Sequence, residues 1–476
     1  MELPWHPLPG DGPRAEIRSP WDGALAGTVP VADDAALEAA IAGAAAAFAV
    51  TRAEPRHRRS AVCRRVSEAI AADADGLATL IARESGKPIR YARAEVSRAV
   101  STFAIAAEEA NRVGGEMVPL DISPAGEGFL GMSVRVPAGP VCAIAPFNFP
   151  LNLVAHKVAP ALAAGCPVVL KPAPQAPLTS FRLAEIVAAA GAAPGALAVL
   201  HMPVPLAQRM AEDPRFALLT FTGSGKVGWA LKAAAGHKRV TLELGGNAPA
   251  IVHGDADLAH AVERCVLGAF ASAGQVCIKL QRLFVHRPLF AEFRERFVAA
   301  ARALPTGDPM DEATVIGPLI DGAAADRVMA WIDEARASGA KVLCGGTREG
   351  AVVAATVIEP GDVDVNAFDS LKVSCEEVFG PVVTLEPYDD FDDALARANA
   401  GQFGLQAAVF TKDLYRARRA AEALDYGGVI VNESPMFRTD NFPYGGTRAS
   451  GHGREGVKHA MDDMLETKML VIGPKG

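Results

Sequence analysis

The sequence predicts an α/β fold with two parallel-sheet lobes and a small β extension, and three observations lead to this prediction. Short apolar runs alternate with amphipathic helical stretches from about residue 141 onward, a second such series starts near residue 248, and a segment rich in Gly and Pro precedes the first. Strands and helices that alternate at this spacing form parallel sheets with right-handed crossovers. At 476 residues the chain is long enough for two or three domains.

The helical pattern comes first along the chain. Residues 33–113 are rich in Ala, with apolar residues three and four apart and charged residues between them. Between residues 118 and 138 Gly and Pro become frequent, and Phe129–Val136 is predicted to be a strand beside a turn. The first alternating series then predicts strands at 141–145, 167–170, 196–200, 216–221 and 239–244, and helices at 153–164, 180–190, 205–212 and from residue 226.

A second α/β unit starts near Ala248. Its predicted helices cover residues 256–273, 288–304, 321–338, 390–399 and 412–424, and its apolar strand segments include 283–285, 382–385 and 429–431. Two α/β lobes in one chain imply a cleft between them, and parallel sheets bind ligands at the carboxyl ends of their strands. We therefore expect the functional site in that cleft.

Composition and charge narrow the class of protein. Half of the residues are hydrophobic and only 6% are aromatic, so Ala, Val, Leu and Ile must form most of the core. The net charge of −8 gives no electrostatic footprint for nucleic acid. Seven scattered cysteines without a CxxC pair and ten histidines without metal-ligand spacing predict a reducing compartment, no disulfide framework and no metal.

Two segments bear on export and on membranes. The first 14 residues lack the basic and apolar regions of a signal peptide. Residues 136–155 carry no formal charge, but the four prolines and two asparagines within them would be costly in a lipid-exposed helix. The sequence therefore predicts a cytoplasmic protein with no membrane and no nucleic-acid partner.

A glycine motif lies between a predicted strand and a predicted helix. Gly223, Gly225 and Gly228 fit the pattern GxGxxG, whose glycines let the backbone approach a phosphate at a helix N-terminus. The motif is weak on its own, and a Gly-rich turn explains it equally well. A P-loop is excluded because Thr220 stands where that motif needs Gly, and Val227 stands where it needs Ser or Thr.

Three side chains in other segments suggest chemistry only when they are taken together. Cys277 follows a predicted helix, Glu243 ends a predicted strand just before a Gly-Gly pair, and Asn148 lies among aromatic residues and prolines. Each alone is best explained structurally, as a core thiol, a capping carboxylate and a rigid loop. Together they supply the nucleophile, the water activator and the oxyanion donor that acyl chemistry needs.

Over nearly its whole length the chain resembles the aldehyde dehydrogenase superfamily. The ordered blocks that carry the resemblance are PFNFP at 146–150, LKPA at 170–173, FTGS at 221–224, ELGG at 243–246, GQVC at 274–277, EEVFGP at 376–381, PYGG at 443–446 and SGHGRE at 450–455. The resemblance implies a Rossmann-like dinucleotide-binding domain in residues 1–117 and 139–246 and a catalytic domain in 247–447. It also implies bridging segments at 118–138 and 448–476 that join subunits into a homodimer or a homotetramer.

The resemblance also implies a role for each matching residue. Cys277 would attack the aldehyde, Asn148 would stabilise the oxyanion of the thiohemiacetal, and Glu243 would activate the water that hydrolyses the thioester. The cofactor, NAD or NADP, would contact Lys171 through its adenosine ribose, Ser224 through its pyrophosphate, and Glu377 and Phe379 through its nicotinamide half; Pro146, Phe147, Gly223, Leu244 and Gly245 complete the predicted cofactor site. Family members that transfer the acyl group to coenzyme A lack the base, so Glu243 favours hydrolysis.

Departures from the family pattern bear on specificity. Pro174 stands where many NAD-preferring relatives carry a glutamate, so a 2′-phosphate meets no repelling charge there and we predict that NADP is accepted. Val276 stands where phosphate-handling relatives can carry an arginine, which disfavours a phosphorylated substrate. The loop at 432–440 resembles the branch with lactaldehyde and non-phosphorylating glyceraldehyde-3-phosphate dehydrogenases. Its Arg438 could hold a carboxylate or brace the loop backbone.

The sequence thus predicts oxidation of a small aldehyde substrate, which we expect to be short and hydroxylated, such as lactaldehyde. A semialdehyde of the succinic type is the alternative within the same chemistry. Two hypotheses from other classes are a cofactor-independent thiol esterase that uses Cys277 and an inactive structural relative. Retention of Cys277, Glu243 and Asn148 together argues against the inactive relative.

Overall fold

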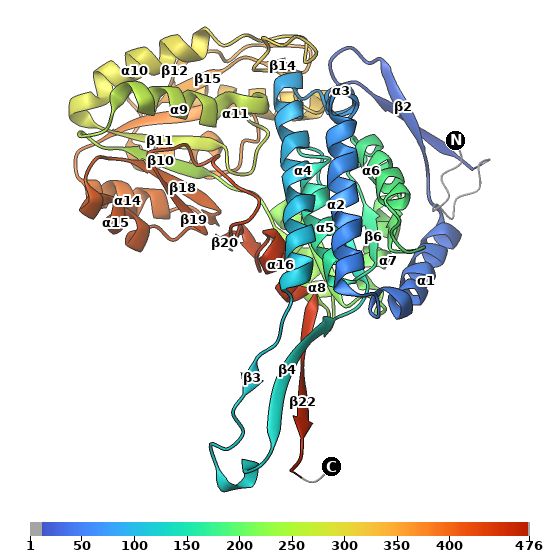
Figure 1. The fold of residues 1–476 in the computed structure, drawn as a ribbon. Helices are drawn as coiled ribbons and strands as arrows, with labels where there is room; N and C mark the ends of the chain where they lie inside the picture. Colours follow the sequence, from blue (N-terminus) through green and yellow to red (C-terminus); the bar gives the residue numbers. More distant parts are fainter. Residues whose placement is uncertain (1–11, 475–476) are drawn as a thin grey trace.

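The computed structural model describes residues 12–474, and its first lobe is built on a six-stranded sheet ordered β21-β9-β8-β5-β6-β7 (Figure 1). All neighbouring strands run parallel except at the β21 edge. Every residue of the central strands β5, β6 and β8 is buried, as expected for a parallel sheet covered on both faces. The strands are β5 (Val141–Ile144), β6 (Val168–Lys171), β7 (Leu197–Val199), β8 (Leu218–Thr222), β9 (Arg239–Glu243) and β21 (Gly451–His452).

Helices cover both faces of this sheet because alternate strand residues point to opposite sides. Cys142, Val169 and Leu219 pack in one core cluster with α1 (Asp34–Thr51), α7 (Val204–Glu212) and α8 (Gly225–Ala234). Val141, Val168 and Leu218 pack in the other cluster with α2 (Arg56–Ala72), α3 (Ala74–Ser85), α4 (Ile89–Arg112), α5 (Asn152–Ala164), α6 (Leu178–Ala189) and α16 (Val457–Asp463). A small hairpin of β1 (Arg14–Arg18) and β2 (Leu25–Pro30) packs near α3 and α6.

The second lobe contains a seven-stranded sheet ordered β12-β15-β16-β11-β10-β18-β19, in which only β12 is antiparallel to its neighbour. The strands are β10 (Ala248–Val252), β11 (Leu280–His286), β12 (Lys341–Cys344), β15 (Thr356–Glu359), β16 (Val382–Tyr388), β18 (Gln406–Phe410) and β19 (Gly428–Val431). One face is covered by α9 (Leu258–Phe270), α10 (Arg287–Arg302) and α11 (Gly322–Ala337), and the other by α14 (Phe391–Asn399) and α15 (Leu414–Ala423).

Short elements complete the second lobe and its junction with the first. They are η2 (Ala271–Gly274), β13 (Arg348–Glu349), β14 (Val352–Val353), α12 (Val365–Asp369), α13 (Lys372–Cys375), β17 (Phe403–Gly404) and β20 (Thr447–Arg448). The pair of β17 with β20 connects the second lobe to the segment that enters β21.

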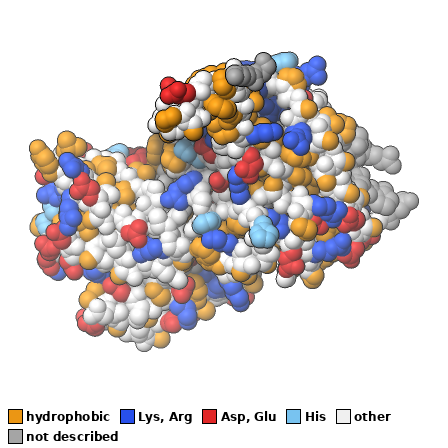
Figure 2. Space-filling view, turned by 90° about the horizontal axis from the view of Figure 1, so that it is seen from below, with side chains coloured by type: hydrophobic (Ala, Val, Ile, Leu, Met, Phe, Trp, Pro, Cys, Tyr) orange, Lys and Arg blue, Asp and Glu red, His pale blue; other side chains and the backbone are white. Residues whose placement is uncertain are grey.

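A three-stranded antiparallel extension protrudes from the body of the molecule, at the bottom of Figure 1. It consists of β3 (Met117–Val118), β4 (Leu130–Pro137) and β22 (Leu465–Ile472), and the turn before β4 includes η1 (Pro124–Gly126). β22 pairs with β4 from Leu465 opposite Pro137 to Ile472 opposite Leu130 and forms one edge of the sheet. In Figure 2, which views the molecule from below, hydrophobic side chains gather on the extension. Met469, Leu470, Val471 and Ile472 are all exposed.

The α/β class and both predicted series are confirmed. The helical pattern of residues 33–113 resolves into α1 to α4, which are separated at Pro55, at Asp73 and at the Gly86–Pro88 turn. No strand was predicted in the β1–β2 hairpin, because most of its residues are exposed or half-buried and lack an apolar run. The predicted helix over 256–273 is wrong at its end, since α9 stops at Phe270.

Three further findings concern the domain division, the N-terminus and a possible membrane helix. The division into domains stays a prediction, although β21 and α16, within the predicted bridging segment 448–476, contact the first lobe. Residues 1–11, on which the expectation of no signal peptide rests, lie outside the described residues. By length and composition alone α1 is apolar enough to cross a membrane, a test that core helices also pass. Leu37 and Ile41 of α1 are buried in the core of the first lobe.

Candidate active site

A cavity of about 870 Å³ lies where the two lobes meet, and it collects the residues that the sequence analysis singled out. The first lobe contributes the carboxyl ends of β5, β6, β8 and β9 and the start of α8, as expected for a parallel sheet. The second lobe contributes the loop before β11 and the segment before β16. All twelve predicted catalytic and cofactor residues line this cavity: Pro146, Phe147, Asn148, Lys171, Gly223, Ser224, Glu243, Leu244, Gly245, Cys277, Glu377 and Phe379.

A left-handed turn places Cys277 in the cavity. After α9, Ser272, Ala273 and Gly274 have φ angles of 54°, 55° and 68°, which end the helix earlier than its sequence predicts. Left-handed Ser and Ala are costly, and such backbone strain clusters at functional sites. Gly274 also lies so close to the Gly380 carbonyl that a Cβ would overlap it. The strained turn therefore holds the chain that leads to Cys277 against the segment that carries Glu377.

The Gly-Gly pair after Glu243 permits a second close approach. A Cβ on Gly246 would overlap the carbonyl oxygen of Cys277, and a Cβ on Gly245 would overlap the Glu377 carboxylate. The Gly246 N–H donates to Glu377 Oε1 at 3.0 Å. These contacts draw the carboxyl end of β9, the nucleophile loop and the Glu377 segment together, and they explain why two glycines follow the predicted base.

Cys277 is half-buried and lines the cavity. Its Sγ lies 3.1 Å from the hydroxyl of Tyr444. Burial raises the pKa of the thiol to about 12, and Glu377 and Glu243 add to this rise, whereas the Tyr444 hydrogen bond and the charge of Arg438 oppose it. A pKa this high favours the neutral thiol near pH 7, so the nucleophile needs activation.

Glu243 is buried, and among the described residues neither of its carboxyl oxygens has a hydrogen-bond partner. Burial raises its pKa well above the usual value, and the nearby charge of Glu455 raises it further. An orphaned buried carboxyl is costly unless water or a ligand satisfies it. Its raised pKa also makes it a better base near neutral pH than an ordinary carboxylate.

The amide of Asn148 is oriented by the nucleophile loop. Its Nδ2 donates to the backbone carbonyl of Gln275 at 3.0 Å. An amide nitrogen carries two hydrogens, so one hydrogen remains for another acceptor. Asn148 is buried and lines the same cavity as Cys277. The arrangement therefore suits an oxyanion donor.

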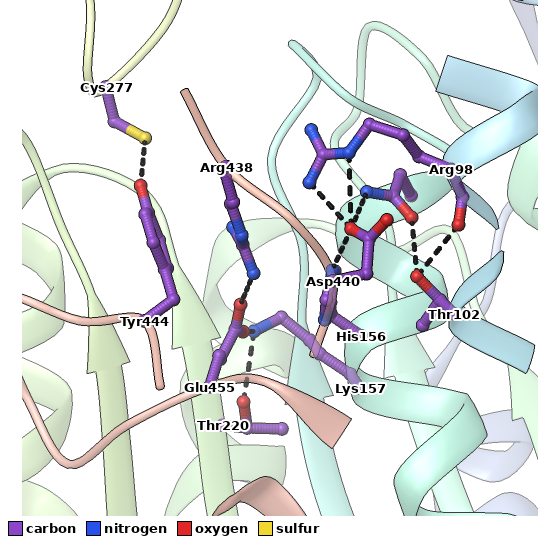
Figure 3. A network of polar contacts seen from close by, with 11 residues as sticks. Arg98, Thr102, His156, Lys157, Thr220, Cys277, Arg438, Asp440, Tyr444 and Glu455 are labelled. Carbon is purple, nitrogen blue, oxygen red and sulfur yellow. Dashed lines mark hydrogen bonds and ion pairs between the residues drawn. The ribbon is translucent and has the colours of Figure 1, made fainter. Parts of the chain in front are cut away.

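Behind the cavity lies a buried ionic network, drawn in Figure 3. Glu455 accepts from Lys157 Nζ at 3.0 Å and from the Arg438 guanidinium at 3.4 Å, and Lys157 also donates to Thr220 Oγ1 at 3.0 Å. Burial alone would raise the pKa of Glu455, but Lys157 and Arg438 outweigh burial and lower it to about 2. The two neighbouring carboxyl groups therefore differ: the pKa of Glu455 is lowered by its cations, and the pKa of Glu243 is raised by burial.

Asp440 organises a second polar group beside the first (Figure 3). It accepts from Arg98 at 2.7 Å, from His156 Nε2 at 2.9 Å and from Asn152 at 3.3 Å. Because these partners belong to α4 and α5, Asp440 fixes the loop that also carries Arg438 to the first lobe. Burial lowers the pKa of His156 to about 4, so its ring is neutral near pH 7.

The remaining cavity fits a dinucleotide. Ser224 caps α8 without using its side chain, so its hydroxyl and the helix N-terminus are available to a phosphate. Lys171 is buried, and Phe147 packs edge to face on Phe379 with ring centroids 5.8 Å apart. Apolar walls with a few polar groups at fixed places are typical of cofactor sites. The predicted cofactor residues thus lie together in a suitable cradle, and their individual roles stay predictions.

Several groups of the site were not predicted from the sequence. Tyr444 lies in the recognised PYGG block, where its hydroxyl was the one available signal for a polar role. Lys157 gives no signal at all, because its partner Glu455 is 298 residues away in the chain. Arg327, which lines the cavity beside Glu377, lies in an ordinary amphipathic helix.

Comparison with known proteins agrees with this geometry. The sequence profile described as the aldehyde dehydrogenase family matches residues 8–470. A 3-sulfolactaldehyde dehydrogenase of Priestia aryabhattai is 42% identical over 417 residues, which cover 87% of this chain and 86% of that protein.

Solved structures are similar over the full length. Aldehyde dehydrogenase 21 of Physcomitrella patens, in complex with its reaction product succinate, has a TM-score of 0.96 and 46% identity, and covers 100% of this chain and 98% of its own. The glyceraldehyde-3-phosphate dehydrogenase GapN of Methanocaldococcus jannaschii, complexed with NADP, has a TM-score of 0.91 and 35% identity, with coverage of 96% and 98%.

Proposed function

Because the chain belongs to the aldehyde dehydrogenase family, we propose that it oxidises a short aldehyde to its carboxylic acid with Cys277 as the nucleophile and NAD or NADP as the electron acceptor. The single observation that carries this proposal is the convergence of Cys277, Glu243 and Asn148 on one interlobe cavity. A thiol, a buried carboxyl group with a raised pKa and an oriented amide are the parts of a thioester mechanism.

The residues divide the chemistry into attack and release. The Cys277 thiolate forms a bond to the carbonyl carbon, and the carbonyl electron pair moves to oxygen, where the free hydrogen of the Asn148 amide stabilises the charge. The nicotinamide ring of NAD or NADP supplies the hydride acceptor when it is bound, and a thioester is then left on Cys277. Glu243, after it has lost its own proton to solvent, takes a proton from water as the water attacks the thioester, and the acid leaves as the sulfur recovers its electron pair.

The end of β6 bears on the choice between NAD and NADP. Lys171, Ala173, Pro174 and Gln175 line the cavity without a carboxylate among them, and Lys226 lines it from the start of α8. A 2′-phosphate entering this region meets cations rather than an anion. We therefore expect NADP to be accepted at least as well as NAD.

The substrate end of the site is apolar near the thiol and cationic beyond it. Cys277 packs with Val276, Ile278 and Tyr444 in a small hydrophobic cluster. Lys157, Arg438 and Arg98 face two carboxylates, Glu455 and Asp440. The cations outnumber the carboxylates by one when Glu243 is neutral, the form that its raised pKa favours. This excess favours a short aldehyde with an anionic far end over an uncharged hydroxyaldehyde such as lactaldehyde.

The names of two similar proteins support the same preference, since one acts on a sulfonated aldehyde and the other forms succinate. The test is a panel of succinic semialdehyde, lactaldehyde, glycolaldehyde and glyceraldehyde 3-phosphate, assayed with both cofactors on the purified protein. Anionic aldehydes without phosphate should give the highest kcat/KM. If uncharged aldehydes gave the highest kcat/KM instead, the substrate would belong to the hydroxyaldehyde class.

Variants test the chemistry itself. Cys277→Ser should abolish the NAD(P)H formation of the wild type. If the wild type were instead a thiol esterase that needs no cofactor, it would hydrolyse esters and form no NAD(P)H. An inactive relative would leave every aldehyde of a broad panel untouched. Full dehydrogenase activity in Cys277→Ser would overturn the proposal.

The extension supports a homodimer or homotetramer. β22 is an edge strand whose residues from Glu466 to Ile472 are all exposed, and a long apolar edge normally pairs with another chain. Light scattering after size exclusion should therefore give two or four times the 49.5 kDa of one chain. All seven cysteines are free, which suits the reducing cytoplasm.

A further inference from the structure

The hydroxyl of Tyr444 is aimed at the reacting sulfur. In Figure 3 its ring stands beside the nucleophile loop, and its Oη lies 3.1 Å from Cys277 Sγ. Among residues 12–474 the sulfur is the one hydrogen-bond partner of this hydroxyl. Tyr444 itself is buried, and its backbone pairs with Glu455. The ring is therefore fixed, and no other acceptor in the described part of the chain competes for its hydroxyl.

The direction of this hydrogen bond follows from the chemistry of the two groups. A phenol hydroxyl is a good donor, whereas a thiol is a weak donor and a thiolate can only accept. The Cζ atom of Arg438 lies 3.6 Å from the centroid of the Tyr444 ring, on its face. A cation over the face withdraws electron density from the ring and strengthens the O–H as a donor. Glu455 binds the same guanidinium and holds it in place.

We propose that Tyr444 is a catalytic residue of this site, whose hydroxyl donates a hydrogen bond to the Cys277 sulfur and stabilises the thiolate that attacks the aldehyde. The inference deepens the proposed function and rests on Cys277 being its nucleophile. The phenol keeps its own proton throughout, and the thiol proton leaves to solvent. When the sulfur forms its bond to carbon, the negative charge moves to the aldehyde oxygen and the hydrogen bond to sulfur weakens.

The groups that face the thiol show why such a donor is needed. Glu243 at the end of β9 and Glu377 before β16 raise the pKa of Cys277, as burial does. Arg438 opposes them through its charge, but its guanidinium lies on the Tyr444 ring and carries no hydrogen bond to the sulfur. Tyr444 is the group that contacts the sulfur directly and favours its ionised form.

The experiment compares the rate at which iodoacetamide alkylates Cys277 in the wild type and in Tyr444→Phe, from pH 6 to 10 and without cofactor. The sulfur displaces iodide, so the rate follows the thiolate population and needs neither aldehyde nor turnover. Mass spectrometry of the peptide that carries Cys277 assigns the modified cysteine. The variant keeps the ring and removes only the hydroxyl. A lost hydrogen bond to a charged group should lower the rate near neutral pH by about tenfold or more and move the pH profile to higher pH.

A matched control is Tyr388→Phe, which removes a tyrosine hydroxyl that binds His253 in another core cluster. Its alkylation profile should coincide with that of the wild type. If Tyr444→Phe does not fold, 3-fluorotyrosine incorporated at position 444 retains the hydroxyl as a stronger acid, and it should move the profile to lower pH.

The outcomes separate this inference from the function on which it rests. A profile of Tyr444→Phe identical to the wild type, or a profile of the fluorinated protein that does not move, overturns the role of Tyr444 while turnover continues. Full dehydrogenase activity in Cys277→Ser overturns the proposed function, whatever the alkylation rates are.

Discussion

Glu243→Gln should separate stability from turnover more cleanly than any other change in this protein. Glu243 is buried, and among the described residues its carboxyl oxygens have no hydrogen-bond partner. Its raised pKa favours the protonated form, and the amide is a neutral group of the same shape as that form. No hydrogen bond and no charge are lost from the protein. Below about pH 4, where this carboxyl group is neutral in both the folded and the unfolded chain, the free energy of unfolding should therefore change by less than about 1 kcal/mol.

The pH dependence of this small change has a definite sign. A carboxyl group whose pKa is raised on folding binds more protons in the folded state, so its contribution to stability falls as pH rises above the unfolded value of about 4.3. The glutamine has no such dependence. The melting temperature of Glu243→Gln relative to the wild type should therefore increase with pH between about 5 and 8.

Turnover should respond in the opposite way. Loss of a general base lowers the rate of the step that it catalyses by about 10²- to 10⁴-fold. Here that step is hydrolysis of the thioester. Stopped-flow absorbance should show a burst of one NAD(P)H per active site followed by a steady rate reduced by that factor. A variant that melts well below the wild type, or one that turns over at the wild-type rate with no burst, would refute the reasoning.

Four further changes test other parts of the site. Glu455→Gln leaves the buried cations Lys157 and Arg438 unpaired and should lower the free energy of unfolding by about 3 kcal/mol or more in denaturant titration; an unchanged midpoint would contradict the network. Gly246→Ala places a methyl group on the carbonyl of Cys277, which should displace the nucleophile and lower kcat by about a hundredfold, while the circular dichroism spectrum stays native. An unchanged kcat would mean that the nucleophile loop moves aside without loss of geometry. Pro174→Glu should move the ratio of kcat/KM for NADP over NAD toward NAD by about tenfold or more, and an unmoved ratio would place the 2′-phosphate elsewhere. Arg98→Met should reduce kcat/KM for succinic semialdehyde by about tenfold or more and leave propanal unaffected; an equal loss for both would assign the arginine to structure alone.

The regular part of the fold could be predicted because its determinants are local. Buried runs such as Val168–Lys171 and the three- and four-residue spacing of the helices are visible in the sequence itself. The turn at Ser272 and Ala273 could not, because neither residue type favours a left-handed conformation. The contacts around the nucleophile impose it, and they come from other parts of the chain.

The candidate site also has a part that could be predicted from the sequence and a part that could not. The residues in recognised blocks, from Asn148 to Glu377, line one cavity as the family resemblance implied. The pairings that adjust them could not be inferred, because they span large sequence separations: Tyr444 is 167 residues from Cys277, and Glu455 is 298 from Lys157. Such pairings depend on the docking of the two lobes and leave no trace in local spacing.

The most direct test of the account is the mass of the Glu243→Gln protein after it is mixed with NADP and its best aldehyde. The proposed chemistry predicts one acyl group per chain, located by peptide mapping on Cys277 and released by hydroxylamine. Formation of NADPH without an adduct on that peptide, or an adduct on another residue, would contradict it.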